Sequence, residues 1–289
     1  MPPVLLFSLA CATPSAPGPD ARQGPDDAQD KPHKVLFIGI DGMRADAFVA
    51  AATPNLDALA SRGALSVTAS SQRTGVIQSA PGWLSVATGV EAERHGVLEN
   101  GGYDALVPDR PTFLHLAHEA GLQTAVVAHW PDILVSVHDP DDVDAGLLRD
   151  DAGVGSDATG IVQQGEVDVL FLHFDDVDHA GHAWGFTPDN SAYTAAIAGV
   201  DGHLAAVLGA VEADETADWL VIMTSDHGGS GTSHGDDIPT HTTVAFILAA
   251  PGGPTGDLPD GVTHMDAHPT VADWLDLETA ADLDGASQL

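Results

Sequence analysis

The chain contains very little positive charge. Its 289 residues include 9 basic and 43 acidic side chains, which gives a formal net charge of −34 at pH 7. No lysine follows Lys34. Because contact with a nucleic-acid duplex depends on basic patches, we expect no nucleic-acid-binding surface. Such a large negative charge is compatible with a salty medium, because dissolved ions screen the repulsion between charges over about 8 Å or less.

Cysteine is almost absent as well, so an internal disulfide is excluded. The single cysteine, Cys11, follows the short apolar stretch of residues 4–10, which resembles the end of a bacterial lipoprotein signal. No basic residue precedes that stretch, and Leu9 stands one place closer to the cysteine than is usual. We expect residues 1–11 to be a leader and the protein to be exported, periplasmic or at the cell surface, with a lipid anchor on Cys11. An ordinary cleaved signal peptide is the alternative.

Long apolar runs are also missing, and none reaches the length that a mature helix needs to span a bilayer. Contact with a membrane is therefore expected only through the N-terminal anchor. Residues 12–33 are rich in Pro, Ala, Gly and Asp without apolar periodicity, which predicts a disordered tether. Residues 34–289, in a chain that is 44% hydrophobic, are long enough to bury one sizeable core.

Strands alternate with helices along this domain. Apolar runs at residues 34–40, 169–173 and 219–225 indicate buried strands, and residues 123–128 a further one. Helices are expected from residue 54, over 111–120 and over 192–211. The alternation predicts an α/β fold with a mostly parallel central sheet covered by helices on both faces.

Three of the apolar runs lead into Asp and His. Asp41 ends the first run, Asp178 and His182 follow the second, and Asp226 and His227 follow the third. Open α/β sheets bind ligands at the edge where such strands end. A lone Asp there is usually a cap or turn residue, but capping does not explain the two accompanying histidines. Imidazole and carboxylate suit zinc, and paired ions serve phosphoryl transfer.

The order and spacing of these motifs resemble the alkaline phosphatase superfamily, and within it the type I phosphodiesterase and nucleotide pyrophosphatase family. The resemblance runs from Lys34 to the end of the chain and implies an alkaline-phosphatase-like catalytic domain. It rests on Ile40-Asp41-Gly42-Met43-Arg44, on Ser79-x-Pro81 leading to Thr88-Gly89, on His95-Gly96-Val97 with Asn100, on Asp178-x-x-Gly181-His182, on Asp226-His227-Gly228 and on His234-Gly235.

Carried over to these positions, the resemblance implies two zinc ions and a serine nucleophile. One ion would be held by Asp178, His182 and His234, and the other by Asp41, Asp226, His227 and the Ser79 oxygen. Ser79 would form a phospho-enzyme. The amide of Asn100 and the backbone N–H after Ser79 would hold a phosphate oxygen. The alternative for Ser79 is a serine that only forms a turn, and the alternative for Asn100 is a polar loop residue without a catalytic role.

Other histidines compete for these roles. His241 lies seven residues after His234, and we prefer His234 as the last ligand because Gly235 follows it and because of its distance from the apolar run 244–250. His241 would then lie behind the ligands. For His95, His173 and His179 we expect hydrogen-bonding or packing roles.

Charge arithmetic favours a phosphodiester substrate. Two zinc ions bring four positive charges, and three aspartates and a serine alkoxide would cancel them, which leaves little attraction for a dianion. Arg44 and Arg73 flank Asp41 and Ser79, but we expect them to face solvent. A phosphomonoesterase or phosphotransferase on the same metals is the alternative. Sulfatase chemistry is disfavoured because Trp83 stands where that related group has an arginine, and a non-catalytic surface lipoprotein is a further reading.

The segment before the last histidine is short. Only residues 228–233 separate Asp226-His227 from His234, whereas the pyrophosphatase relatives carry a long insertion there. Without a large cap insertion the site is expected to be shallow and exposed. Specificity could then rest on aromatic side chains near the ligands, namely Trp83, Trp130, Trp184 or Phe186.

Overall fold

The computed structural model describes residues 31–289, which form one compact unit. The expected leader of residues 1–11, including Cys11, and residues 12–30 of the expected tether lie outside the described residues. The first strand begins at His33, one residue before the expected start of the domain.

One eight-stranded sheet runs through this unit in the order β4-β3-β5-β1-β6-β7-β2-β8. The strands from β4 to β6 are parallel, while β7 is antiparallel to both β6 and β2. This arrangement confirms the expected α/β class with a mostly parallel sheet. The strands are β1 His33–Ile40, β2 Ala64–Ser70, β3 Thr124–Ala128, β4 Ala145–Leu148, β5 Val169–Phe174, β6 Asp218–Thr224, β7 Thr243–Ala249 and β8 Gly256–Asp257.

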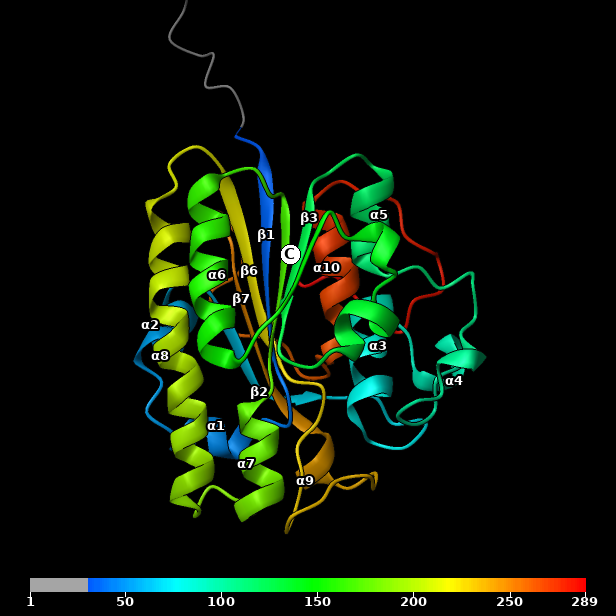
Figure 1. Ribbon diagram of the computed structural model, residues 1–289, viewed down its shortest axis with the longest axis vertical. Coiled ribbons are helices and arrows are strands. Elements are labelled where there is room, and N and C mark those ends of the chain that lie inside the picture. Colours follow the sequence, from blue (N-terminus) through cyan, green and yellow to red (C-terminus); the bar gives the residue numbers. More distant parts are fainter. Residues whose placement is uncertain (1–30) are drawn as a thin grey trace, which may run out of the picture. The chain divides into compact units, whose positions relative to one another are not determined.

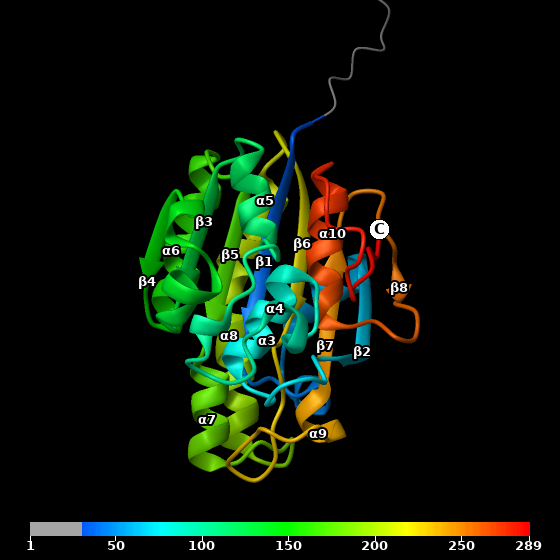
Figure 2. The same cartoon turned by 90° about the vertical axis from the view of Figure 1, so that its right-hand side faces the viewer.

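Helices cover both faces of the sheet (Figures 1 and 2). Helices α2, α6 and α8 lie against one face, and α3, α5 and α10 against the other. The helices are α1 Ala45–Ala50, α2 Pro54–Arg62, α3 Ser79–Thr88, α4 Ala92–His95, α5 Phe113–Glu119, α6 Asp151–Gln164, α7 Asp176–Trp184, α8 Ser191–Ala213, α9 Pro239–Thr242 and α10 Ala267–Trp274.

The central strand β1 is buried on both faces, which explains why its sequence is an unbroken apolar run. Its side chains alternate between the two faces of the sheet. Leu36 and Ile38 belong to the core that includes Leu204 of α8, whereas Val35 and Phe37 belong to the core on the opposite face. Strand β1 is thereby held in a fixed register between its neighbours, and its carboxyl end is a rigid position.

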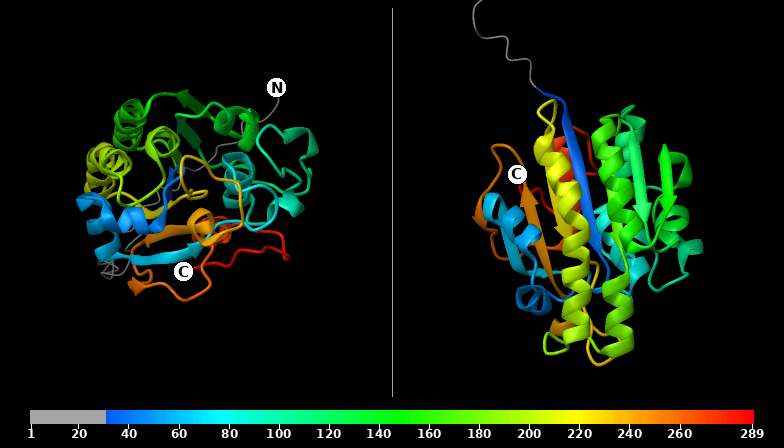
Figure 3. Two further views of the ribbon diagram at one scale, coloured as in Figure 1. Left: turned by 90° about the horizontal axis from the view of Figure 1, so that it is seen from below. Right: turned by 60° about the vertical axis from the view of Figure 1, so that its left-hand side comes forward.

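Helix α8 corrects the expectation that no segment reaches membrane-spanning length. By length and composition it is able to cross a membrane, and it is the helix of the described residues that passes this test. In the fold it packs against α6, α7 and α2 (Figure 3), and Ile197, Val200 and Leu204 are buried in the core. Its Asp201 accepts the backbone N–H groups of Asn55 and Leu56 at the start of α2. These contacts are those of a core helix of this domain.

His138 is a buried imidazole without a hydrogen-bond partner, and it makes the stability of the fold depend on pH. It is fully buried against Phe171, at 4.8 Å between ring centroids, and neither of its nitrogens has a partner among residues 31–289. Burial lowers the pKa of His138 to about 3. Below the ordinary pKa of 6.5, the unfolded chain therefore binds a proton at His138 and the folded chain does not. The stability present above that pH is lost as the pH falls toward 3.

We expect His138→Leu to raise the free energy of unfolding, because it removes this proton-linked penalty and two unsatisfied nitrogens. One buried histidine costs about 1.4 kcal/mol for each pH unit below its ordinary pKa, so the gain at pH 5 exceeds the gain at pH 8 by about 2 kcal/mol. Urea unfolding at the two pH values measures the difference. Equal gains at both would show that His138 does not titrate in this way.

Candidate metal centre

Three neighbouring strands bring the Asp and His side chains to one edge of the sheet. Strand β1 lies between β5 and β6 and ends next to Asp41. Strand β5 leads into α7, which carries Asp178 and His182, and β6 is followed by Asp226 and His227. All three strands are parallel, so their carboxyl ends lie at the same edge of the sheet, which is the lower edge in Figure 1, beside α7.

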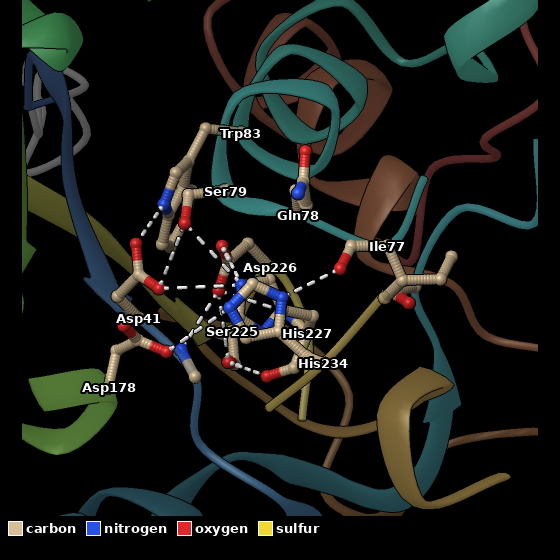
Figure 4. A network of polar contacts seen from close by, with 12 residues as sticks. Asp41, Ile77, Gln78, Ser79, Trp83, Asp178, Ser225, Asp226, His227 and His234 are labelled. Carbon is tan, nitrogen blue, oxygen red and sulfur yellow. Dashed lines mark hydrogen bonds and ion pairs between the residues drawn. The ribbon is translucent and has the colours of Figure 1, made fainter. Parts of the chain in front are cut away.

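Ser79 faces this edge from the first position of α3 (Figure 4). Its Oγ lies 3.4 Å from Asp41 Oδ1 and 3.4 Å from His227 Nε2. The approach of α3 requires a glycine, because a Cβ at Gly82 would lie 2.8 Å from the Cβ of Asp226. The sequence therefore places a serine hydroxyl among the carboxylate and imidazole groups.

One group of side chains comprises Asp178, His182 and His234. His182 Nε2 lies 3.1 Å from His234 Nε2 and 3.3 Å from Asp178 Oδ2. His234 Nε2 lies 3.8 Å from Asp178 Oδ1. The other ring nitrogens are bound to backbone carbonyls, His182 Nδ1 to Thr232 and His234 Nδ1 to Ile77. These bonds leave both Nε2 atoms directed at the carboxylate.

The second group comprises Asp41, Asp226 and His227, which are all buried. His227 Nε2 lies 3.3 Å from Asp226 Oδ2 and 3.6 Å from Asp41 Oδ1. The rings of His227 and His234 stack at 3.9 Å. Donor atoms of Asp178, His227 and His234 also lie within 4.8 Å of one another, so His227 borders both groups.

The electrostatics of the centre favour the binding of a positively charged group. Burial, together with the charge of Asp41, raises the pKa of Asp178 to about 9 and raises that of Asp226. Burial lowers the pKa of His227 to about 3, so this imidazole is neutral at pH 7. Within the described part of the chain, Asp178 Oδ1 and Asp226 Oδ2 are buried acceptors without a hydrogen-bond donor. Unpaired carboxylate oxygens beside neutral imidazoles are a donor set that fits divalent metal ions.

The sequence model of the family described as type I phosphodiesterase / nucleotide pyrophosphatase matches residues 35–246. The chain belongs to this family. This match confirms the resemblance found in the sequence motifs. The Asp and His clusters agree with a metal-dependent member of the family.

Individual relatives are distant and longer. The bis(5'-adenosyl)-triphosphatase enpp4 of Xenopus laevis is 22% identical over 225 residues, which cover 71% of this chain and 49% of that protein. A phosphopentomutase of Edwardsiella ictaluri is 30% identical over 119 residues, covering 41% of this chain and 27% of that protein. The chain thus spans half or less of the length of these curated relatives.

Solved structures share the fold at low identity. Murine ectonucleotide pyrophosphatase/phosphodiesterase 5, an inactive variant of which is described in complex with AMP, superposes with a TM-score of 0.72 at 14% identity, covering 88% of this chain and 97% of that one. A structure described as a sulfatase of Bacteroides thetaiotaomicron gives 0.70 at 17% identity, covering 89% and 74%. These likenesses support the alkaline-phosphatase-like architecture.

In this family member the orientation of Asp41 is set by His173, for which a hydrogen-bonding or packing role was expected, and by Trp83, which was considered only as a core or substrate-contacting residue. Asp41 Oδ2 accepts a hydrogen bond from Trp83 Nε1 at 2.9 Å and lies 3.1 Å from His173 Nε2. Although burial alone would raise the pKa of Asp41, the hydrogen bond from His173 holds it below its ordinary value. Oδ1 is left facing Ser79. Trp83 is fully buried and is therefore not a platform for substrate.

Asn100 does not adopt the arrangement expected from the family. Its side-chain Oδ1 accepts the backbone N–H of Ala80 at 2.8 Å. A backbone N–H at the start of a helix needs an acceptor, and the amide oxygen of Asn100 satisfies it. Asn100 therefore occupies the N–H that was expected to hold a phosphate oxygen, and its side chain must turn before that N–H is free.

His241 lies outside both groups of candidate ligands. Its Nε2 is 2.8 Å from Ser230 Oγ, and its Nδ1 accepts the backbone N–H of Asp236 at 3.1 Å. His95 is bound to Ser85 Oγ at 3.1 Å. The structure thus brings His234, and not His241, to Asp178 and His182.

Arg44 does not face solvent as expected, because its side chain is only 12% exposed. Arg44 pairs with Asp46 and donates to the carbonyls of Phe186 and Gly229. Lys34 Nζ donates to the carbonyls of Gly165 and Val167 near the start of β1, at the other end of the strand from Asp41. Neither cation is directed at the candidate ligands.

Of the four aromatic residues considered for specificity, only Trp184 is strongly exposed, at 68%. Phe186 is buried, with ring centroids 5.2 Å from His182 and 6.0 Å from His234, so it supports these imidazoles. Trp130 is partly buried, with its ring 6.4 Å from that of His173. The structure therefore assigns Trp83 and Phe186 to the support of the ligands.

Proposed function

We propose that this family member is a two-zinc phosphohydrolase of the phosphodiesterase and nucleotide pyrophosphatase type, working through a phosphoserine at Ser79. The observation that carries the proposal is the position of the Ser79 hydroxyl, 3.4 Å from both Asp41 Oδ1 and His227 Nε2. A serine that only formed a turn would not need to lie against buried carboxylates and neutral imidazoles. The family match supports the same chemistry.

The two groups of side chains would each hold one ion. Asp178, His182 and His234 would bind the first, while Asp41, Asp226 and His227 would bind the second together with Ser79 Oγ. When bound, zinc supplies Lewis-acid charge that favours the serine alkoxide and offsets negative charge on the departing oxygen. The orphaned oxygens of Asp178 and Asp226 are the structural sign that these side chains need such a partner.

The chain itself supplies the nucleophile and its orientation. The Ser79 hydroxyl gives its proton to solvent and Oγ bonds to phosphorus as the bond from phosphorus to the leaving-group oxygen breaks, and that oxygen takes a proton from solvent. Asp41, held by Trp83 and His173, fixes the direction of the Ser79 hydroxyl. In the second step a water oxygen bonds to phosphorus, the bond to Oγ breaks, and Ser79 regains its proton.

The start of α3 is suited to the charge on the phosphate. Backbone N–H groups at a helix N-terminus attract anions. Once the Asn100 side chain turns, the N–H of Ala80 becomes available to a non-bridging phosphate oxygen, and the Asn100 amide is placed to donate to the same oxygen.

A diester fits the charges of the centre better than a monoester. Three aspartates and a serine alkoxide would neutralise two zinc ions, and Arg44 and Lys34 are engaged elsewhere. Little positive charge is left for the second negative charge of a monoester. The partial match to a phosphopentomutase keeps a monoesterase or phosphotransferase as the competing function.

We expect the zinc-loaded protein to hydrolyse bis-p-nitrophenyl phosphate with a higher kcat/KM than p-nitrophenyl phosphate, because the diester carries one negative charge and the monoester two. Release of p-nitrophenol measures both rates under the same conditions. A strong preference for the monoester would overturn the diesterase assignment in favour of the monoesterase or phosphotransferase.

A further inference from the structure

A second cluster of His and Asp lies beside the candidate centre. Donor atoms of His129, Asp176 and His179 lie within 4.8 Å of one another. His129 directly follows β3, and Asp176 and His179 are three residues apart in α7, so they share one face of that helix. The three side chains thus project from a strand end and a helix, which fix their positions.

The orientation of His129 is set by a buried carboxylate. His129 Nδ1 lies 2.8 Å from Asp151 Oδ1, and Asp151 is only 1% exposed. The same carboxylate accepts the backbone N–H groups of Asp175 at 2.9 Å and Asp176 at 3.1 Å, so it cannot swing away. Nδ1 of His129 also lies 3.8 Å from Asp176 Oδ1, so Asp151 holds this edge of the ring against the cluster.

The cluster is rich in negative charge. Asp151, Asp175 and Asp176 all lie beside it, and within the described part of the chain their ion-pair partners are histidines alone. The side chains of His129, Asp176 and His179 are 23%, 55% and 60% exposed, so an ion from solvent reaches them.

We propose that His129, Asp176 and His179 bind a transition-metal ion, such as zinc or cobalt, at a site additional to the candidate pair. Two imidazoles and one carboxylate select these ions over magnesium or calcium. Three protein ligands leave a coordination position open. The groove between α7 and α8, which run side by side in Figure 3, has a volume of about 420 Å³ and is lined by Asp176, His179 and the exposed Trp184. Small ligands therefore have access to the open position.

The proposed site lies close to Asp41. His179 Nε2 is 3.4 Å from Asp175 Oδ2, and donor atoms of Asp175, His173 and Asp41 lie within 4.8 Å of one another. Asp175 and His173 therefore lie between the proposed site and the carboxylate that faces Ser79.

Zinc stoichiometry tests the proposal. The full chain is stripped with a chelator, and zinc bound per chain is counted by equilibrium dialysis at micromolar free zinc. We expect Asp176→Asn combined with His179→Gln to bind one zinc fewer than the unaltered chain. His118→Gln is the matched control, because His118 is also a half-exposed histidine near a carboxylate, 4.0 Å from Asp144, and it should bind as many ions as the unaltered chain.

A second comparison separates this site from the candidate pair. In a chain carrying Asp226→Asn and His234→Gln, we expect one cobalt ion to remain, seen by its visible absorption, and to be lost when Asp176 and His179 are also replaced. Asp151→Asn should weaken that remaining binding by about 10- to 100-fold. Circular dichroism confirms that each variant is folded. The proposal would be overturned if zinc content were the same with and without Asp176 and His179, or if the chain carrying Asp226→Asn and His234→Gln bound no cobalt. Neither result would bear on the proposed function.

Discussion

The substitution Ser79→Ala is expected to lower kcat/KM for bis-p-nitrophenyl phosphate by about 10⁴-fold or more, the size of effect seen when a covalent nucleophile is removed. The hydroxyl lies 3.4 Å from both Asp41 Oδ1 and His227 Nε2, and an alanine methyl group cannot form the bond to phosphorus. Initial rates across substrate concentrations measure the loss. Zinc content should stay close to that of the unaltered chain, because six other ligands remain.

Ser61→Ala is the matched control for this substitution. Ser61 is exposed on α2, where its hydroxyl bonds to the carbonyl of Ala58, and its replacement should leave the rate unchanged. Acid quenching during turnover of bis-p-nitrophenyl phosphate should trap a p-nitrophenyl phosphoryl group on Ser79 in the unaltered chain, and no such adduct should form in Ser79→Ala. Full activity in Ser79→Ala would contradict the phosphoserine mechanism and support a chain that retains the fold without this catalysis.

Removal of divalent metal is the second large effect, and we expect a chelator to reduce hydrolysis to the rate of a protein-free blank. Without cations, burial and the charge of Asp41 favour protonated Asp178 and Asp226, and the Ser79 hydroxyl loses the charge that would activate it. Activity is measured before dialysis, after dialysis against a chelator, and after addition of each metal.

Zinc should restore this activity and magnesium should not, because the centre offers His182, His227 and His234, and imidazole suits zinc, while magnesium prefers oxygen ligands. His241→Gln is the control, since His241 is bound to Ser230 and Asp236 and holds no proposed ion. Hydrolysis that survives the chelator would count against metal dependence. Loss of the zinc response in His241→Gln would show that His241 takes part in binding the metal.

The sequence predicted the central part of the fold well because burial there leaves a simple pattern. Strands β1, β5 and β6 are buried on both faces, so each is a continuous apolar run that ends in Asp or leads to it. The antiparallel pair β2 and β7 was not anticipated. The sequence Ala64–Ser70 mixes apolar and polar residues without a continuous apolar run, and its pairing depends on contacts with distant residues.

The limits of prediction at the site have a similar origin. The Asp and His motifs identified the residues that converge, but they contain no information on side-chain direction. Trp83 looked like a core or substrate residue, and its hydrogen bond to Asp41 depends on how α3 packs against β1. The amide of Asn100 was assigned to phosphate, although local geometry gives Ala80 N–H to its oxygen. The role of Asp151 beside His129 likewise required the fold.

Helix α3 carries both Ser79 and Trp83, which are four residues apart and so project from the same side of the helix. Helix α3 thus carries the attacking oxygen of Ser79 and also, through Trp83, the hydrogen-bond donor that orients Asp41. The position of this one helix therefore sets both where the Ser79 oxygen lies and how the facing carboxylate is turned toward it.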